Sequence, residues 1–127
     1  MSYGFSKAVN IPFDAAVDKV TAELQKEGFG VLTTIDVKET LKKNLNVDFK
    51  KYKILGACNP PFAHKALQAE EEIGLLLPCN VIVYEKDGKS IVAAFDPLSM
   101  SRVMNNPVVE PIAVEMKKRL ERVIAAV

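Results

Sequence analysis

The chain has 127 residues, of which 49% are hydrophobic and 26% are charged, and this is the composition of one globular domain. The formal net charge is +1, so bulk electrostatics give no reason to expect binding to nucleic acid, an anionic membrane or an acidic partner. No apolar run approaches the roughly 20 residues of a membrane span, and residues 1–14 lack a signal-peptide pattern. Two cysteines do not form a disulfide framework in a chain of this size, so reduced thiols are expected. The sequence therefore predicts one cytoplasmic domain over residues 1–127.

The first half of the chain alternates strand and helix patterns. Residues 3–9 alternate weakly and predict a strand. Residues 13–27 repeat apolar side chains at the helical period, and Gly28 is placed to end that helix in the left-handed conformation. A β-branched strand over residues 29–35 leads to a short helix that Asp36 is expected to cap. A further strand is predicted over residues 52–58.

The second half begins with a helix that starts at Pro60 and Pro61. Residues 81–85 and 90–95 predict two strands, and Asp87-Gly88 between them is a strong hairpin signal. Asp96 and Pro97 predict the cap and first turn of a short helix, and a last helix follows Asn106-Pro107. The order β-α-β-α-β-α-β-β-α-α predicts an α/β (α+β) fold with helices layered on a mixed sheet.

Cys58 is the first candidate for chemistry, because it ends a predicted strand and closely precedes a proline-initiated helix. Backbone N–H groups and the helix dipole at such a position stabilise a thiolate. No base or resolving partner lies nearby in the sequence, however, and free cysteines are among the most buried residue types. A small side chain packed under the turn is therefore the more common explanation for Cys58.

Cys58, His64 and Cys79 are weak candidates for soft metal ligands. Their spacing matches no closed zinc pattern, and the helical wheel places His64 on the solvent face. If the intervening helix is a parallel crossover, the two cysteines lie at opposite ends of the sheet, about 17 Å apart, too far for a disulfide or a shared metal. They meet only if the two strands run antiparallel, or if the second strand begins near Leu75.

Other patterns favour ordinary structural roles. Five lysines between residues 42 and 53, interleaved with Phe49 and Tyr52, resemble a phosphate or nucleic-acid patch. Three glutamates at residues 70–72 offset part of this charge, and a solvated helix end explains the lysines equally well. With a single histidine on the solvent face and no paired carboxylates, the sequence offers no catalytic constellation.

Four short motifs resemble the domain of unknown function 302 family: LGACNP at residues 55–60, LLPCNV at 76–81, Asp96-Pro97 and Asn106-Pro107. The resemblance spans nearly the whole chain. It implies a compact α/β domain that is often a dimer in crystals, and it implies no established activity. In this family the Asn-Pro, Leu-Pro and Asp-Pro motifs recur, whereas the two cysteines belong to one branch.

We therefore expect a homodimeric binding or interaction domain whose ligand and cofactor the sequence does not identify. The alternative is a thiol-dependent redox or metal-handling protein that acts through Cys58, perhaps with Cys79. The candidate reactive or ligand-contacting residues are Cys58, Asn59, Pro60, Cys79 and Asp96.

Overall fold

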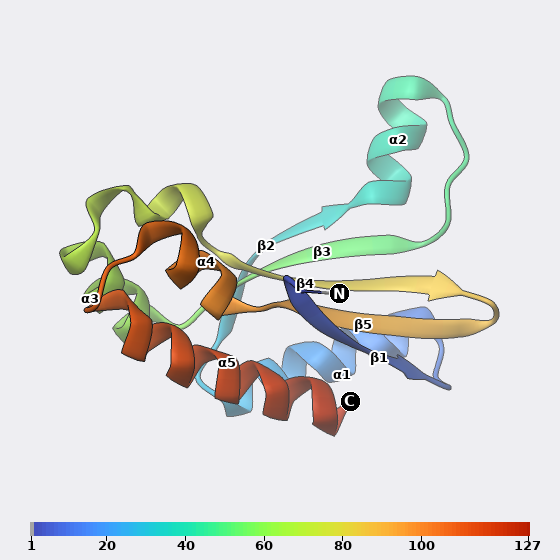
Figure 1. Ribbon diagram of the computed structural model, residues 1–127. Coiled ribbons are helices and arrows are strands. Elements are labelled where there is room, and N and C mark those ends of the chain that lie inside the picture. The colour runs from blue at the N-terminus through green and yellow to red at the C-terminus, as the bar shows by residue number, and fades with distance from the viewer. Residues whose placement is uncertain (1) are drawn as a thin grey trace.

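The computed structural model describes residues 2–127 and contains one five-stranded sheet in the order β1-β5-β4-β3-β2 (Figure 1). The strands are β1 (Gly4–Val9), β2 (Gly30–Asp36), β3 (Tyr52–Cys58), β4 (Cys79–Lys86) and β5 (Lys89–Phe95). The helices are α1 (Phe13–Lys26), α2 (Val37–Leu45), α3 (Pro60–Ala69), α4 (Pro97–Met104) and α5 (Val109–Ala126), with a 3-10 helix, η1 (Glu71–Leu76), before β4.

The predicted α/β class and the order of strands and helices are confirmed. The hairpin forms as expected, with Lys86 opposite Lys89 and with Asp87 and Gly88 both at positive φ, which matches the twist of the flanking strands. The structure differs from a mixed sheet in that each pairing among the described strands is antiparallel. Strand β4 runs antiparallel to β3 because α3 and η1 lie together at one end of the sheet and return the chain at that same end.

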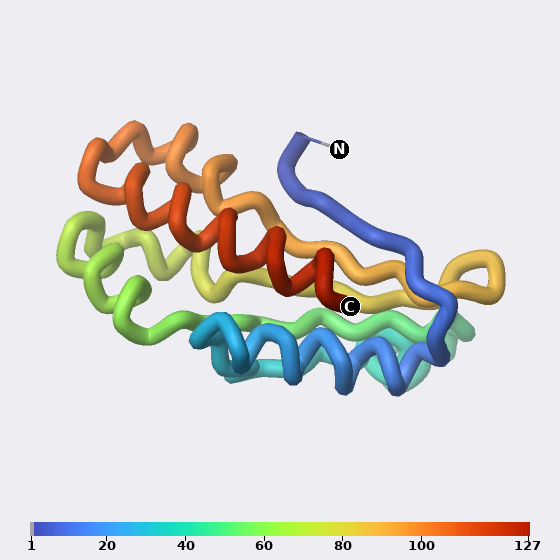
Figure 2. The backbone as a smooth tube through the Cα atoms, turned by 90° about the horizontal axis from the view of Figure 1, so that it is seen from below, coloured from blue at the N-terminus to red at the C-terminus, as the bar shows by residue number. Residues whose placement is uncertain are grey.

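Helices α1 and α5 cover one face of the sheet (Figure 2). The apolar repeat of the predicted helix at residues 13–27 accounts for this packing, because Ala16, Val20 and Leu24 are fully buried. They join Leu120 and Val123 of α5 against the inward-facing strand residues, which are Leu55, Ala57, Val81, Val83, Val92 and Ala94. Each fully buried Leu or Val side chain stabilises the fold by about 1.5–3 kcal/mol.

Helices α3, η1 and α4 gather at one end of the sheet, at the left of Figure 1. Together with the first residue of α5, Val109, they form a second, smaller core that contains Ala66, Ile73 and Met100. Asp96 caps α4 as predicted, since its carboxylate accepts a hydrogen bond from the Leu98 N–H at 2.9 Å. The junction between the two cores forms the candidate site.

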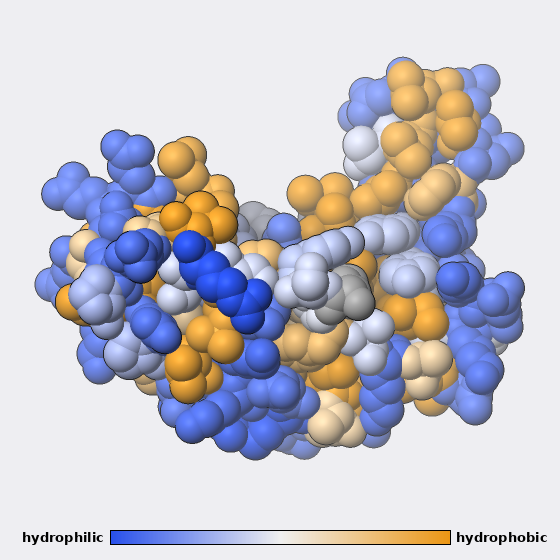
Figure 3. Space-filling view, in the orientation of Figure 1, coloured by the Kyte–Doolittle hydropathy of each residue, from blue (hydrophilic) through white to orange (hydrophobic). Residues whose placement is uncertain are grey.

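The other face of the sheet is not covered by a helix, and α2 projects from the sheet at the end away from α3 (Figures 1 and 3). The predicted cap is confirmed, because the Asp36 carboxylate accepts from the Glu39 N–H at 3.0 Å. Although α2 has an apolar stripe of Val37, Leu41 and Leu45, none of its residues is buried. Within residues 2–127, no helix has both the length and the apolar character to cross a bilayer.

Candidate ligand-binding cavity

A cavity of about 320 Å³ lies where the end of the sheet meets α3, α4 and α5. Its walls are predominantly apolar, and the side chains that line it include no Asp, Glu, Lys, Arg or His. The larger lining residues are Phe29, Leu32, Phe62, Leu67, Leu77, Met100, Ile112 and Met116, and the polar ones are Thr33, Cys58, Asn59 and Cys79. A cavity of this kind suits a neutral ligand with an apolar body and a small polar group.

The strand register brings the two cysteines to this cavity. Strand β3 runs antiparallel to β4 and places Ala57 directly opposite Cys79, so Cys58 is one residue from the partner of Cys79. The parallel-crossover alternative, with the thiols at opposite ends of the sheet, is therefore wrong. Both cysteines are free thiols, Cys58 half-buried and Cys79 buried.

The start of α3 provides few N–H groups for a thiolate at Cys58. The first two residues of the helix are Pro60 and Pro61, which have no N–H. The Ala63 N–H donates to the Asn59 carbonyl at 2.9 Å. Among the helix residues that precede this first intrahelical bond, only Phe62 has an N–H group to offer to an anion. The two prolines therefore weaken the argument, made from the sequence, that the start of α3 stabilises a thiolate at Cys58.

Cys79 lies in surroundings that favour the neutral thiol. Burial, and to a smaller extent the nearby thiol of Cys58, raise the pKa of Cys79 to about 11. A thiol with this pKa is almost entirely protonated at neutral pH and is a weak nucleophile. Cys79 therefore acts as part of the cavity wall, where its S–H group is a weak hydrogen-bond donor.

Asn59 is buried and ties the entrance of α3 to the end of α1. Its amide nitrogen lies 3.4 Å from the Glu27 carbonyl oxygen, which also accepts from Arg119 Nη1 at 3.1 Å. The Arg119 guanidinium in turn lies over the Phe62 ring, 5.0 Å from its centroid. This network fixes Asn59 and Phe62, so the wall of the cavity that they form is held in place.

Two of the residues singled out in the sequence lie outside the cavity wall. Pro60 is exposed at the start of α3. Asp96 is buried and engaged on both oxygens, with Leu98 N–H on one and Lys117 Nζ at 3.2 Å from the other. The structure thus brings Cys58, Asn59 and Cys79 together, and it gives Asp96 a capping and ion-pairing role next to the cavity residue Pro97.

The proposed metal set does not come together. His64 lies on the exposed face of α3, as the helical wheel predicts, and does not line the cavity. Among residues 2–127 no group of three or more His, Cys, Asp or Glu side chains is placed to hold a metal ion. The soft ligands in the cavity wall are the two thiols and the thioethers of Met100 and Met116.

Sequence reasoning missed most of the cavity wall. Phe29 follows the end of α1, Met100 belongs to α4 and Met116 to α5. For each of these side chains, the local sequence pattern predicts only an ordinary core position in its own helix or strand. Only their convergence in space at one end of the sheet distinguishes them.

The chain belongs to the family described as domain of unknown function DUF302, whose model matches residues 5–127. Its fold is similar to that in the crystal structure of an uncharacterized conserved DUF302 protein from Bacillus stearothermophilus, with a TM-score of 0.92 and 28% sequence identity. That similarity covers 99% of this chain and 98% of the other. No curated protein matches the sequence. The expected family and fold are therefore confirmed, and the family description states no activity.

Proposed function

We propose that this protein is a binding domain that takes a small, neutral, largely apolar molecule into the cavity at the end of its sheet. The observation that carries the proposal is a cavity of about 320 Å³ with predominantly apolar walls. Engineered apolar cavities of about 150 Å³ stay dry and bind benzene, so a larger apolar cavity has room for a two-ring or branched molecule.

The chemistry of the wall defines the ligand class. Phe29, Phe62 and Met116 offer aromatic and polarisable contacts, which favour a planar or unsaturated ligand. The Thr33 hydroxyl and the Asn59 amide are the polar groups able to orient one hydroxyl or carbonyl. A charged ligand is disfavoured because burial of a charge without a partner is costly.

Titration with the neutral fluorophore N-phenyl-1-naphthylamine tests the proposal. Wild-type protein should give a saturable rise in fluorescence. Ala66→Leu, which fills the cavity from α3, should weaken binding by about tenfold or more, because each 1.4 kcal/mol of lost contact is a factor of ten. The matched control is Ala15→Leu, the same change on the exposed face of α1.

Ala63→Leu provides a second filling variant at a half-buried position, in case the fully buried Ala66 does not tolerate the larger side chain. Circular dichroism establishes that each variant is folded. Absence of saturable binding to wild-type protein contradicts the proposal, as does unchanged binding by both folded filling variants.

The second candidate function is thiol chemistry at the same cavity, favoured by the presence of both free cysteines in its wall. The raised pKa of Cys79 opposes it at neutral pH. Titration with Cu(I), a soft ion that two cysteines can ligate, tests this alternative. Stoichiometric binding that the Cys58→Ser variant abolishes would favour the thiol function over the binding of an apolar molecule.

A further inference from the structure

Asn59 carries an unused hydrogen-bond acceptor in the wall of the cavity. It is 5% exposed and occupies the N-cap position of α3, where an asparagine side chain usually accepts from the backbone N–H of the second or third helix residue. Here the side chain makes no such bond, and the second helix residue, Pro61, has no N–H to donate. The oxygen of the Asn59 side chain is therefore not used to cap the helix.

The orientation of the Asn59 amide follows from its contact with the end of α1. Among residues 2–127, the only side-chain hydrogen bond of Asn59 runs from Nδ2 to the Glu27 carbonyl oxygen. The opposite orientation would place Oδ1 against that carbonyl oxygen, and two acceptors repel each other. Gly28 packs against the nitrogen side, since a Cβ atom there would lie 3.0 Å from Nδ2. Neither Glu27 nor Gly28 lines the cavity, so the amide oxygen is the atom left to face it.

This oxygen is unpaired but is not sealed off from free space. Among residues 2–127, the Ser99 hydroxyl is the only buried side-chain oxygen or nitrogen that lacks both a partner and an accessible surface. Asn59 Oδ1 also lacks a protein partner, so it keeps contact with free space, and the cavity is the space that Asn59 lines. A buried acceptor without a partner is costly, and a ligand that supplies a donor removes this cost.

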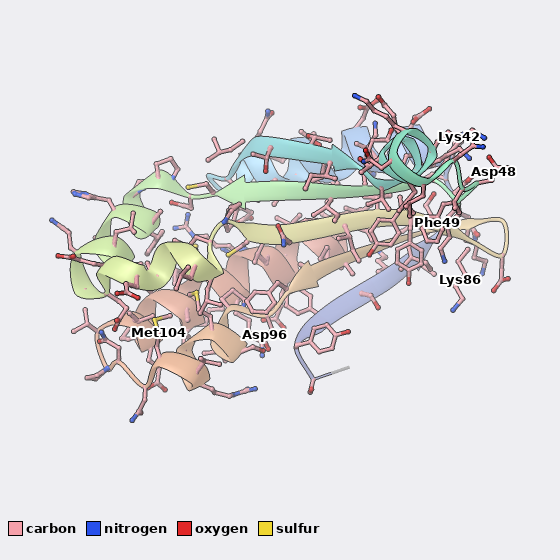
Figure 4. All side chains as sticks on the ribbon, turned by 90° about the horizontal axis from the view of Figure 1, so that it is seen from above. Lys42, Asp48, Phe49, Lys86, Asp96 and Met104 are labelled. Atoms are coloured by element: carbon pink, nitrogen blue, oxygen red, sulfur yellow. The ribbon has the colours of Figure 1, made fainter. Side chains whose placement is uncertain are left out.

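The surroundings of Asn59 favour a neutral donor. Asn59 provides the one side-chain carbonyl oxygen in the cavity wall that residues 2–127 form. The lysines of α2 lie far from it: Figure 4 shows Lys42 and Asp48 at one end of the sheet, and Asp96 and Met104 toward the end that contains the cavity. An ionised group would find no counter-charge among the lining side chains, whereas a neutral O–H or N–H group finds the Asn59 oxygen.

We propose that the ligand of the cavity is an apolar ring compound that donates one O–H or N–H hydrogen bond to Asn59 Oδ1. Phenols and indoles have this chemistry, whereas ethers and ketones of the same shape do not. The inference rests on the proposed function, which admits hydroxyl and carbonyl ligands alike, and it narrows that class to donors. An acceptor placed against Oδ1 would leave both atoms unpaired, and a site of this kind discriminates strongly against such a ligand.

Indole and benzofuran test the selection, because both consist of two fused rings and the N–H group of one replaces the oxygen atom of the other. Competition with N-phenyl-1-naphthylamine gives both dissociation constants. Wild-type protein should bind indole about tenfold more tightly than benzofuran, and Asn59→Ala should reduce this preference to about twofold or less. The matched control is Asn80→Ala, at an exposed position of β4 outside the cavity, which should keep the wild-type preference.

Two further measurements protect the test against a variant that does not fold. Asn59→Leu removes the acceptor and keeps the size of the side chain. Indole labelled with ¹⁵N reports on the wild-type protein itself, because the N–H proton of the bound molecule should move downfield and exchange slowly with water.

Equal binding of indole and benzofuran would overturn the inference and leave the cavity proposal intact, as would a preference that a folded Asn59 variant retains. A preference that Thr33→Val abolishes and Asn59→Ala preserves would also overturn it, because the ligand contact would then belong to Thr33. Failure of indole to displace a bound fluorophore would have the same meaning. Absence of binding by the fluorophore and by both compounds would instead remove the proposed function and this inference together.

Discussion

Gly56 of β3 lies against Thr33 of β2, so closely that the hydroxyl of Thr33 fills the space where a Cβ atom would stand. The same Cβ would lie 2.8 Å from Cγ of Pro78. The absence of a side chain at Gly56 therefore lets β2, β3 and the start of β4 meet at the base of the cavity.

Gly56→Ala is expected to lower the free energy of unfolding by about 1–3 kcal/mol, because both neighbours must move. Gly30→Ala is the control on the adjacent strand, where a Cβ would meet nothing within 4 Å. Urea unfolding of both variants measures the difference. Equal stability of the two variants would contradict this prediction, because it would mean that Thr33 and Pro78 move aside without lowering the free energy of unfolding.

The pH dependence of stability reports on Cys79. Its folded pKa of about 11 exceeds the reference value of 9.0, so the stability it contributes is complete below pH 9 and is lost as the pH rises through 11. Between about pH 8 and 10.5 the wild-type chain should lose about 2 kcal/mol more than Cys79→Ala. Other groups titrate in this range, so the measured quantity is the difference between the two urea-unfolding series.

The two thiols should differ in their rates of alkylation. Cys58 is half-buried at the cavity, whereas Cys79 is buried and has a raised pKa. Iodoacetamide at neutral pH should therefore modify Cys58 first, with the sites assigned by peptide mass spectrometry. N-phenyl-1-naphthylamine should slow the reaction of Cys58. Equal rates at the two cysteines would contradict the difference in burial and pKa, and a lack of protection would place Cys58 outside the occupied volume.

Asp96 is expected to stabilise the fold without contacting a ligand in the cavity. Asp96→Ala removes the cap of α4 and the partner of Lys117, and should cost about 1–2 kcal/mol. Asp96→Asn retains an oxygen that accepts from Leu98 N–H and should cost less. Since Asp96 does not line the cavity, fluorophore affinity should stay within about twofold of wild type in both folded variants, a free-energy change of about 0.4 kcal/mol. A larger loss would make Asp96 a ligand contact.

The sequence determined the local structure well. The apolar period of residues 13–27, the Asp87-Gly88 turn and the caps Asp36 and Asp96 each depend on neighbouring residues, and each forms as predicted. The direction of β4 relative to β3 was open, because the same helix pattern fits a parallel crossover or a return at the same end. Only the pairing of Ala57 with Cys79 decides between them.

The cavity could not be predicted from local sequence patterns, for a related physical reason. Phe29, Met100 and Met116 are separated by long stretches of sequence, and each fits an apolar core position. A void depends on how well side chains from different elements fill the space between them, which no local period encodes. Cys58 and Cys79 can be singled out because they are the two cysteines of the chain, and Asn59 because it belongs to the Asn-Pro motif on which the family resemblance rests.

Methionine methyl groups offer the most direct test of the central claim, that the cavity binds a neutral apolar molecule. Met100 and Met116 line the cavity, whereas Met104, on the same helix as Met100, does not. In protein labelled with ¹³C at the methionine methyls, naphthalene should shift the Met100 and Met116 signals saturably and leave Met104 nearly unchanged. No shift at near-saturating naphthalene, or equal shifts of all three signals, would contradict the account.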